Sequence, residues 1–284
     1  MAKELLDKIN VTRPRAILFL VFTAVLWSFG GLFIKLIEWN PIAIAGMRSV
    51  MTALLLLALY GKPNFKFSFP QILAAIAYSS HLILFVTANK LTTAANTILL
   101  QYTSPIYVAI LGALFLKERV YLSDWITIAS VMLGMILSFM DSLKLGNLLG
   151  NILAILSGLF FAIMTVSLKY QKSGSPIMSI FWGNVLTVVI GIPFMFGPLP
   201  DTKSWITMLI SGVFQLGLSY ALYAMAIKKV TALESVLVPV IEPVLNPLFV
   251  FVFTGEVPGP WMLIGGTIIL ISVTAKCVYT STRQ

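Results

Sequence analysis

The sequence predicts an all-α integral membrane protein with ten transmembrane helices arranged as two inverted repeats of five. The first observation is composition, because 59% of the 284 residues are hydrophobic and only 10% are charged. A soluble domain averages about 45–50% apolar and about 25% charged residues. The second is a series of apolar runs of about 20 residues, the length that crosses a bilayer as a helix. The third is a set of residues that recurs between the two halves.

The apolar runs are continuous, whereas strands of a membrane barrel alternate, so the spans are predicted to be helices. Short turn-like segments such as Asn40-Pro41 and Gly197-Pro198 separate them. No separator is long enough to hold a folded soluble domain. The predicted spans cover residues 16–37, 41–60, 70–88, 93–116, 122–140, 146–168, 176–196, 204–227, 231–254 and 258–279.

Residues 1–15 are polar and basic, and the run that follows is too long for the core of a signal peptide. We therefore expect a cytoplasmic lead. If it is cytoplasmic, fourteen of the 19 Lys and Arg residues fall in inside loops or ends and four fall outside, while Arg48 lies within a span. This bias predicts that both termini are cytoplasmic and that the number of spans is even. Basic loops also suit a cell membrane with anionic inner lipids.

An internal repeat divides the chain into residues 16–144 and 145–284. Lys35 and Lys169 end the first and sixth spans, and other pairs recur about 138 residues apart. Because five spans are an odd number, the second copy must be inverted in the membrane. Inverted repeats typically place a solute site near the midplane. The matching pairs are Thr93 with Thr231, Ser104 with Glu242, Phe115 with Phe253, Glu118 with Glu256 and Trp125 with Trp261.

The order and spacing of several short motifs resemble the drug/metabolite transporter superfamily, specifically its EamA-type ten-helix members. The resemblance implies a bundle whose central cavity is lined by spans 1, 3, 4, 6, 8 and 9, with spans 5 and 10 peripheral. It implies transport of a small organic solute without fixing which one. The motifs are Leu26-Trp27-Ser28-Phe29-Gly30-Gly31, Met47-Arg48, Pro105, Leu116-Lys117-Glu118-Arg119, and Glu242-Pro243 followed by Gly255-Glu256.

Polar side chains within a bilayer are costly, so they usually face a protein interior or a water-filled cavity. Glu242 lies near the middle of the ninth span, and Glu234 shares its helix face two turns away. Asn96 and Thr103 lie on the paired fourth span. We interpret these residues as a polar wall that recognises a cationic or zwitterionic group. Hydrogen bonding between helices and helix capping are the alternative roles.

Two further stripes combine aromatic and polar residues on the third and eighth spans. The repeat relates His81, the only histidine, to Ser219 and relates Phe85 to Tyr223. We predict that both stripes face one cavity, although packing alone also produces such stripes. The candidates are Tyr78, His81, Phe85, Gln215, Ser219 and Tyr223, joined by Trp27 from the first span.

Three charged residues are assigned to gating or capping. Arg48 lies one or two turns below the outer face, where it can pair with a carboxylate of the solute or protein, or snorkel to the interface. Glu118 and Glu256 end the fourth and ninth spans at opposite faces. We interpret both as helix caps or as gate partners of a nearby Lys or Arg.

Other chemistries find little support in the sequence. The net charge of +9 arises from pairs of basic residues at span ends, so a nucleic-acid partner is not expected. One histidine and one cysteine, Cys277, do not form a metal cluster. The sequence has no phosphate-binding loop and no evident nucleophile–base pair. We therefore expect no enzyme activity, cofactor or bound metal.

The expected function is alternating-access transport of an amino acid or related metabolite, with export favoured. Efflux of cationic or lipophilic toxic compounds is the alternative within transport, and an intramembrane enzyme or lipid-handling protein is the alternative from another class. Protons are the candidate coupling ion, carried by Glu242 or His81. The expected assembly is a monomer or a weak homodimer.

Overall fold

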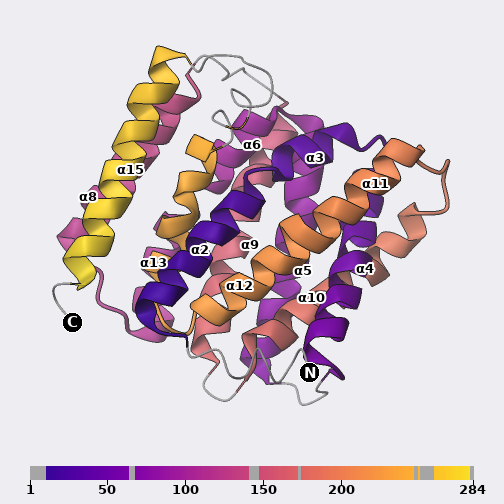
Figure 1. Cartoon of the computed structure of the whole chain (residues 1–284), viewed down its shortest axis with the longest axis horizontal. Helices are drawn as coiled ribbons and strands as arrows, with labels where there is room; N and C mark the ends of the chain where they lie inside the picture. The colour runs from indigo at the N-terminus through magenta and orange to yellow at the C-terminus, as the bar shows by residue number, and fades with distance from the viewer. Residues whose placement is uncertain are drawn as a thin grey trace.

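The computed structural model describes residues 11–63, 68–140, 147–171, 174–245, 249 and 259–281. Every regular element in these residues is a helix, as Figure 1 shows. Eight helices are long and apolar enough to cross a membrane, and Leu122–Ser138 is a shorter apolar helix. The ninth predicted span is described only in part. The all-helical membrane class predicted from the sequence is therefore confirmed.

The element boundaries follow local helix signals. In α4, the Asn40 side chain accepts hydrogen bonds from the Ile42 and Ala43 N–H groups at 2.9 and 3.4 Å, and Pro41 occupies the first turn. Gly61, with φ of 74°, ends this helix. The elements are α2 (Arg13–Trp27), α3 (Gly30–Leu36), α4 (Pro41–Tyr60), α5 (Phe69–Leu91), α6 (Ala94–Gln101), α7 (Ser104–Leu111), η1 (Gly112–Leu116), α8 (Leu122–Ser138), α9 (Leu148–Tyr170), α10 (Pro176–Gly191), η2 (Ile192–Phe194), α11 (Thr202–Ile210), η3 (Ser211–Leu218), α12 (Ser219–Ala226), α13 (Ala232–Leu237), η4 (Val238–Ile241) and α15 (Pro260–Ser281).

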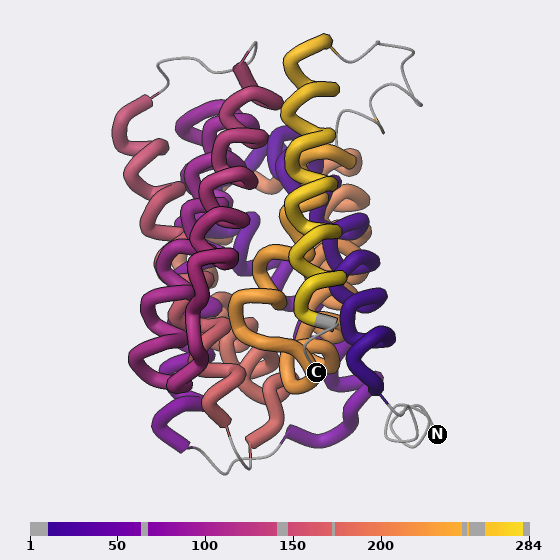
Figure 2. The backbone as a smooth tube through the Cα atoms, turned by 90° about the vertical axis from the view of Figure 1, so that its left-hand side faces the viewer, coloured from indigo at the N-terminus to yellow at the C-terminus, as the bar shows by residue number. Residues whose placement is uncertain are grey.

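The packing of the helices repeats with the two halves exchanged. Helix α5 of the first half packs along α9 of the second, and α12 of the second half packs in the same way along α2 of the first. Likewise α10 packs on α5, and η3 packs on α4. Figure 2 shows the long helices running side by side. We call the face where α2 begins and α15 ends the base, and the opposite face the top. The fold is thus two inverted five-helix repeats.

Glycines allow close approach where equivalent helices of the two repeats meet. A Cβ atom on Gly191 would lie 2.8 Å from the Cα of Gly46, where α10 meets α4. A Cβ on Gly265 would lie 2.2 Å from the Gly134 carbonyl oxygen, where α15 meets α8. The pair α8 and α15 stands at one side of the bundle (Figure 1), which agrees with a peripheral position for spans 5 and 10. Small residues at such interfaces are typical of membrane helices.

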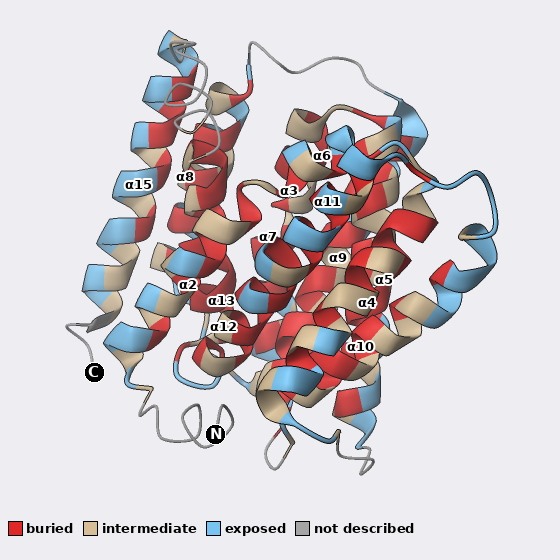
Figure 3. Ribbon diagram, turned by 45° about the vertical axis from the view of Figure 1, so that its right-hand side comes forward, coloured by how far each residue is buried: buried red, intermediate tan, exposed pale blue. Residues whose placement is uncertain are grey.

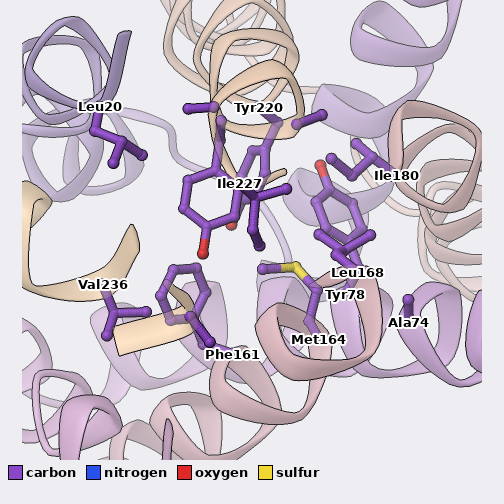
Figure 4. Close-up of a cluster of buried hydrophobic side chains, with 14 of the residues drawn as sticks. Leu20, Ala74, Tyr78, Phe161, Met164, Leu168, Ile180, Tyr220, Ile227 and Val236 are labelled. Atoms are coloured by element: carbon purple, nitrogen blue, oxygen red, sulfur yellow. The ribbon is translucent and has the colours of Figure 1, made fainter. Parts of the chain in front are cut away.

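Burial is distributed as lipid exposure requires. Figure 3 shows buried residues facing the interior and exposed ones on the outer helix faces. Many of the exposed side chains are large and apolar, such as Leu18, Phe22 and Phe115. The interior contains an aromatic cluster around Tyr78, Phe161 and Tyr220 (Figure 4). An apolar exterior around a partly polar interior is the pattern of a multi-pass membrane protein.

Two spans predicted as continuous helices are interrupted inside the bundle. The first breaks between Trp27 and Gly30, and the fourth breaks between Gln101 and Ser104. Pro105 favours the start of α7 because it lacks the N–H that would continue the preceding helix. In the ninth span, the 3₁₀ turn η4 contains Pro239 and ends at Ile241, directly before Glu242. Interrupted helices near mid-depth are a hallmark of transporter solute sites.

Candidate functional site

A small cavity of about 30 Å³ lies at the level of these interruptions. Its wall includes the residue next to each interruption. Span 2 contributes as well, although the family resemblance implied a wall without it. The lining residues are Trp27, Arg48, His81, Leu82, Phe85, Gln101, Phe161, Gln215, Leu216, Tyr220 and Glu242.

Aromatic rings form one side of the cavity. Trp27 and Phe161 meet edge to face with centroids 5.7 Å apart, and Tyr220 lies 5.2 Å from Trp27. Trp27 and Phe161 are separated by the same interval as Lys35 and Lys169, so they are equivalent residues of the two repeats. The aromatic wall therefore lies where the two repeats meet, and it offers apolar ring faces to a bound molecule.

Arg48 and Gln215 form the basic side of the cavity. Arg48 is only 2% exposed, and its Nη2 donates a short hydrogen bond to Gln215 Oε1. The guanidinium therefore points into the protein instead of snorkelling to the interface. Gln215 lies in η3, a π-helical segment of the eighth span. Such segments often occur at functional sites because they shift the register of the helix face.

Glu242 forms the acidic side. The Tyr102 hydroxyl donates to Glu242 Oε2 at 2.6 Å and also lies 3.0 Å from the Pro239 carbonyl oxygen. The carboxyl group is buried, and Tyr102 is the side chain that holds it in place. The cavity thus contains one cationic and one acidic side chain, contributed by different repeats.

His81 is held by span 6. Its Nδ1 lies 3.1 Å from the Ser157 carbonyl oxygen and 3.0 Å from Ser157 Oγ. If Nδ1 donates to the carbonyl oxygen, Nε2 of a neutral imidazole is left as a hydrogen-bond acceptor. Ser157 Oγ also lies 3.5 Å from the His81 carbonyl oxygen, and the repeat symmetry reproduces this backbone contact as Thr23 Oγ1 donating to the Ser219 carbonyl oxygen at 3.2 Å. The imidazole itself is oriented by Ser157.

Comparison with known proteins identifies the family to which the chain belongs. The model of the EamA-like transporter family matches residues 14–140 and again residues 148–275. The chain belongs to the EamA-like transporter family. It is 26% identical over 263 residues to an uncharacterized transporter of Archaeoglobus fulgidus, covering 89% of this chain and 93% of that protein.

Two further similarities are partial or concern the fold alone. The chain is 26% identical over 194 residues to the uncharacterized transporter YxxF of Bacillus subtilis (strain 168), a match that covers 66% of this chain and 62% of YxxF. A protein of known crystal structure superposes with a TM-score of 0.78 over 92% of this chain and 96% of its own, at 16% identity. That identity supports a shared fold only.

Five of the eleven predicted binding residues of this EamA-family chain line the cavity, namely Trp27, His81, Phe85, Gln215 and Glu242. Ser219 lies behind the wall, where its Oγ accepts from Trp27 Nε1 at 2.9 Å. Tyr78 and Tyr223 are fully buried. The Tyr78 hydroxyl accepts from Asn184, and the Tyr223 hydroxyl bonds Thr165 and Ser235.

The other three predicted residues lie elsewhere. The Asn96 side chain bonds Thr92 and Asn151 near the top, and Thr103 Oγ1 donates to the Leu100 carbonyl oxygen in the interruption of span 4. Glu234 forms an ion pair of 2.6 Å with Arg13 at the base and caps α13. The prediction assumed straight helices, and the interruptions shift the faces on which these residues lie.

Gln101, Phe161 and Tyr220 line the cavity but were not predicted from the sequence. Phe161 had a detectable signal, because it is the repeat equivalent of Trp27. Gln101 is placed by the interruption of span 4, and a Cβ on Gly158 would lie 2.5 Å from its carbonyl oxygen. Among the residues that the structure describes, no group of three or more His, Cys, Asp or Glu side chains is placed to hold a metal ion.

Polar links join the two repeats at the base. Glu118 accepts hydrogen bonds from the Ala232 N–H at 3.0 and 3.2 Å, and burial raises the pKa of its carboxyl group. Lys276 pairs closely with Asp124. Together with the pair between Arg13 and Glu234, these links connect spans 1, 4 and 5 to spans 9 and 10. Glu256, the predicted counterpart of Glu118, lies outside the described residues.

Proposed function

We propose that this protein is a secondary transporter that moves a small organic solute by alternating access. The observation that carries the proposal is a cavity at the interruptions of the spans, walled by residues of both inverted repeats. Rocking of one repeat against the other exposes such a cavity to each side in turn. We infer a cell-membrane location with both termini cytoplasmic from the bias of Lys and Arg, so the base faces the cytoplasm.

The proposed solute class is an amino acid or a related metabolite. Glu242 offers a carboxylate to an ammonium group, and the aromatic wall of Trp27, Phe161 and Tyr220 offers apolar surface to a side chain. Gln101 and Gln215 supply neutral donors and acceptors nearby. Export is the proposed direction.

A proton is the proposed coupling ion. Glu242 and His81 both line the cavity and are both buried, so a proton on either one alters the charge that the solute meets. Uptake into proteoliposomes with and without an imposed pH gradient tests this step. If uptake proceeds at the same rate with and without the pH gradient, transport is not coupled to protons.

The central test is exchange of tritiated L-amino acids by the purified protein in proteoliposomes. We expect saturable exchange of at least one amino acid, and we expect Glu242→Gln to weaken the apparent affinity about tenfold or more, because the ammonium group loses its charged partner. The control is Glu38→Gln, which neutralises an exposed acid outside the cavity, and its affinity should stay within twofold. Absence of exchange for every amino acid would refute the proposed solute class.

Efflux of cationic lipophilic compounds is the second candidate, because Glu242 and the aromatic wall also suit an aromatic cation. Ethidium and tetraphenylphosphonium serve as probes in the same liposomes. Transport of these cations without competition by amino acids would favour this second function.

A further inference from the structure

We propose that Arg48 binds a carboxylate group of the transported solute and that Gln215 positions Arg48 for this role. This inference rests on the proposed transport function and specifies which chemical group the cavity requires. Neither the family match nor the relatives assign a role to either residue. The juxtaposition that carries it is a buried guanidinium, incompletely paired, on the wall of the central cavity.

The first step is that the Arg48 guanidinium forms no ion pair with a carboxylate of the described residues. Arg48 is 2% exposed, and its Nε has no hydrogen-bond partner. Within the described residues, no carboxylate oxygen lies within 4.0 Å of its nitrogens. Its partner Gln215 is neutral. A buried charge without a paired charge is costly, so a protein retains one where a ligand supplies the opposite charge.

The second step is the geometry of the free donors. A guanidinium has five N–H donors in a planar fork, and Gln215 engages one nitrogen, Nη2. Nε–H is buried and has no partner, and a carboxylate matches one edge of the guanidinium fork with two parallel hydrogen bonds.

The third step distinguishes a carboxylate from a phosphate. Glu242 lines the same cavity, so a doubly charged anion bound at Arg48 would meet a nearby negative group. A solute with one carboxylate and one ammonium group matches Arg48 and Glu242 with one charge each. The charges of the cavity therefore favour a zwitterion with a single carboxylate.

The fourth step is how the fold holds Arg48 at the cavity. Span 2 approaches span 8 closely, because a Cβ on Gly212 would lie 2.8 Å from the Arg48 carbonyl oxygen. Thr52 Oγ1 donates to the Gly212 carbonyl oxygen at 2.7 Å and fixes the same contact. Gly30 leaves room for the Gln215 amide, since a Cβ there would lie 2.7 Å from Nε2. Three spans thus position one guanidinium.

The test uses two pairs of ligands that differ only at the carboxylate. L-phenylalanine is compared with L-phenylalaninamide, and 3-phenylpropionate is compared with 3-phenylpropanamide. Dissociation constants are measured on the purified protein in detergent for the wild type, Arg48→Gln and Arg48→Lys. Arg15→Gln serves as the control, because it removes the same type of cation near the base. Phenyl phosphate is the probe for a phosphate-binding site.

We expect the wild type and Arg15→Gln to bind each carboxylate about tenfold or more tightly than its amide, and Arg48→Gln to lose this preference. Equal binding of acid and amide by the wild type would overturn the proposal, and this comparison does not depend on whether a variant folds. Tighter binding of phenyl phosphate than of 3-phenylpropionate would also overturn it.

The outcomes separate this inference from the proposed function. If 3-phenylpropionate binds in an Arg48-dependent way but no amino acid is exchanged, the carboxylate site stands and the amino-acid function fails. If amino acids are exchanged and Arg48→Gln keeps the preference for acid over amide, the function stands and the role of Arg48 fails.

Discussion

Adding one methyl group at Gly30 should weaken solute binding without unfolding the protein. The Cβ of Gly30→Ala would lie 2.7 Å from Gln215 Nε2. An ordinary contact needs about 3.5 Å, so the amide must move by about 0.8 Å. This amide is the end of a flexible side chain and can move at little cost, but the movement lengthens and misdirects the hydrogen bond that its Oε1 accepts from Arg48. A hydrogen bond to a charged group contributes about 1.5–3 kcal/mol.

Losing part of this contribution should lower the affinity for a carboxylate-bearing solute by up to about tenfold. The assay is exchange in proteoliposomes, with the melting temperature measured on the same preparations. Gly31→Ala is the matched control, because its Cβ meets Ala94 at 3.3 Å and nothing closer. Each alanine also favours the helix by about 0.5–1 kcal/mol. Unchanged affinity for Gly30→Ala, or an equal loss for Gly31→Ala, would refute the reasoning.

Three further predictions concern stability. Gly265→Ala should destabilise the bundle by about 1–3 kcal/mol, because the new Cβ would clash with backbone atoms of α8. Gly266→Ala is the control and should be tolerated, because the nearest contact of its Cβ is at 3.2 Å. Thermal unfolding in detergent compares the two variants. Tyr223→Phe should lower the free energy of unfolding by about 0.5–1.5 kcal/mol, because the Tyr223 hydroxyl loses its hydrogen bonds to Thr165 and Ser235. Solute affinity should stay unchanged, since this hydroxyl does not face the cavity, and a large change in affinity would contradict the prediction. Burial raises the pKa of Glu118 above 4.5, so its carboxyl group ionises less readily in the folded state than in the unfolded state. The melting temperature of the wild type should therefore fall relative to that of Glu118→Gln as the pH rises through the raised pKa. Parallel plots of melting temperature against pH for the two proteins would contradict this.

Most of the fold could be predicted from the sequence. Apolar runs locate membrane helices because lipid demands about 20 apolar residues for each crossing, and α4 begins and ends where Pro41 and Gly61 indicated. The inverted repeat followed from the recurrence of short motifs and the odd number of spans in each half. These signals are local or periodic, so a single sequence carries them.

The site was harder to predict because it depends on departures from regular helices. Asn96 and Thr103 share a face only on a straight helix, and span 4 breaks between Gln101 and Ser104. Gln215 was predicted, but its contact with Arg48 depends on the π-helical register of η3. From the sequence, Arg48 was predicted to lie near the outer face, and its partner could not be chosen. Both its depth and its partner depend on how the helices pack, which one sequence does not reveal.

Two sets of polar links should behave differently under the proposed alternating access. Lys35 Nζ donates to the Thr92 carbonyl oxygen at 2.8 Å, and its counterpart Lys169 donates to that of Val230 at 2.5 Å. Each of these two hydrogen bonds joins segments of the same repeat, so movement of one repeat against the other leaves both bonds intact. The three links at the base instead cross between repeats, and the proposed alternating access requires them to break when that face opens.

Glu234 and Asp124 are each only 4% exposed, so separating them from Arg13 and Lys276 costs more than the roughly 1 kcal/mol of a surface pair. Inverting a 1:99 population requires about 5.5 kcal/mol of preferential binding. Under the proposed mechanism, the free energy that separates these pairs must therefore come from preferential binding of the solute to the open form.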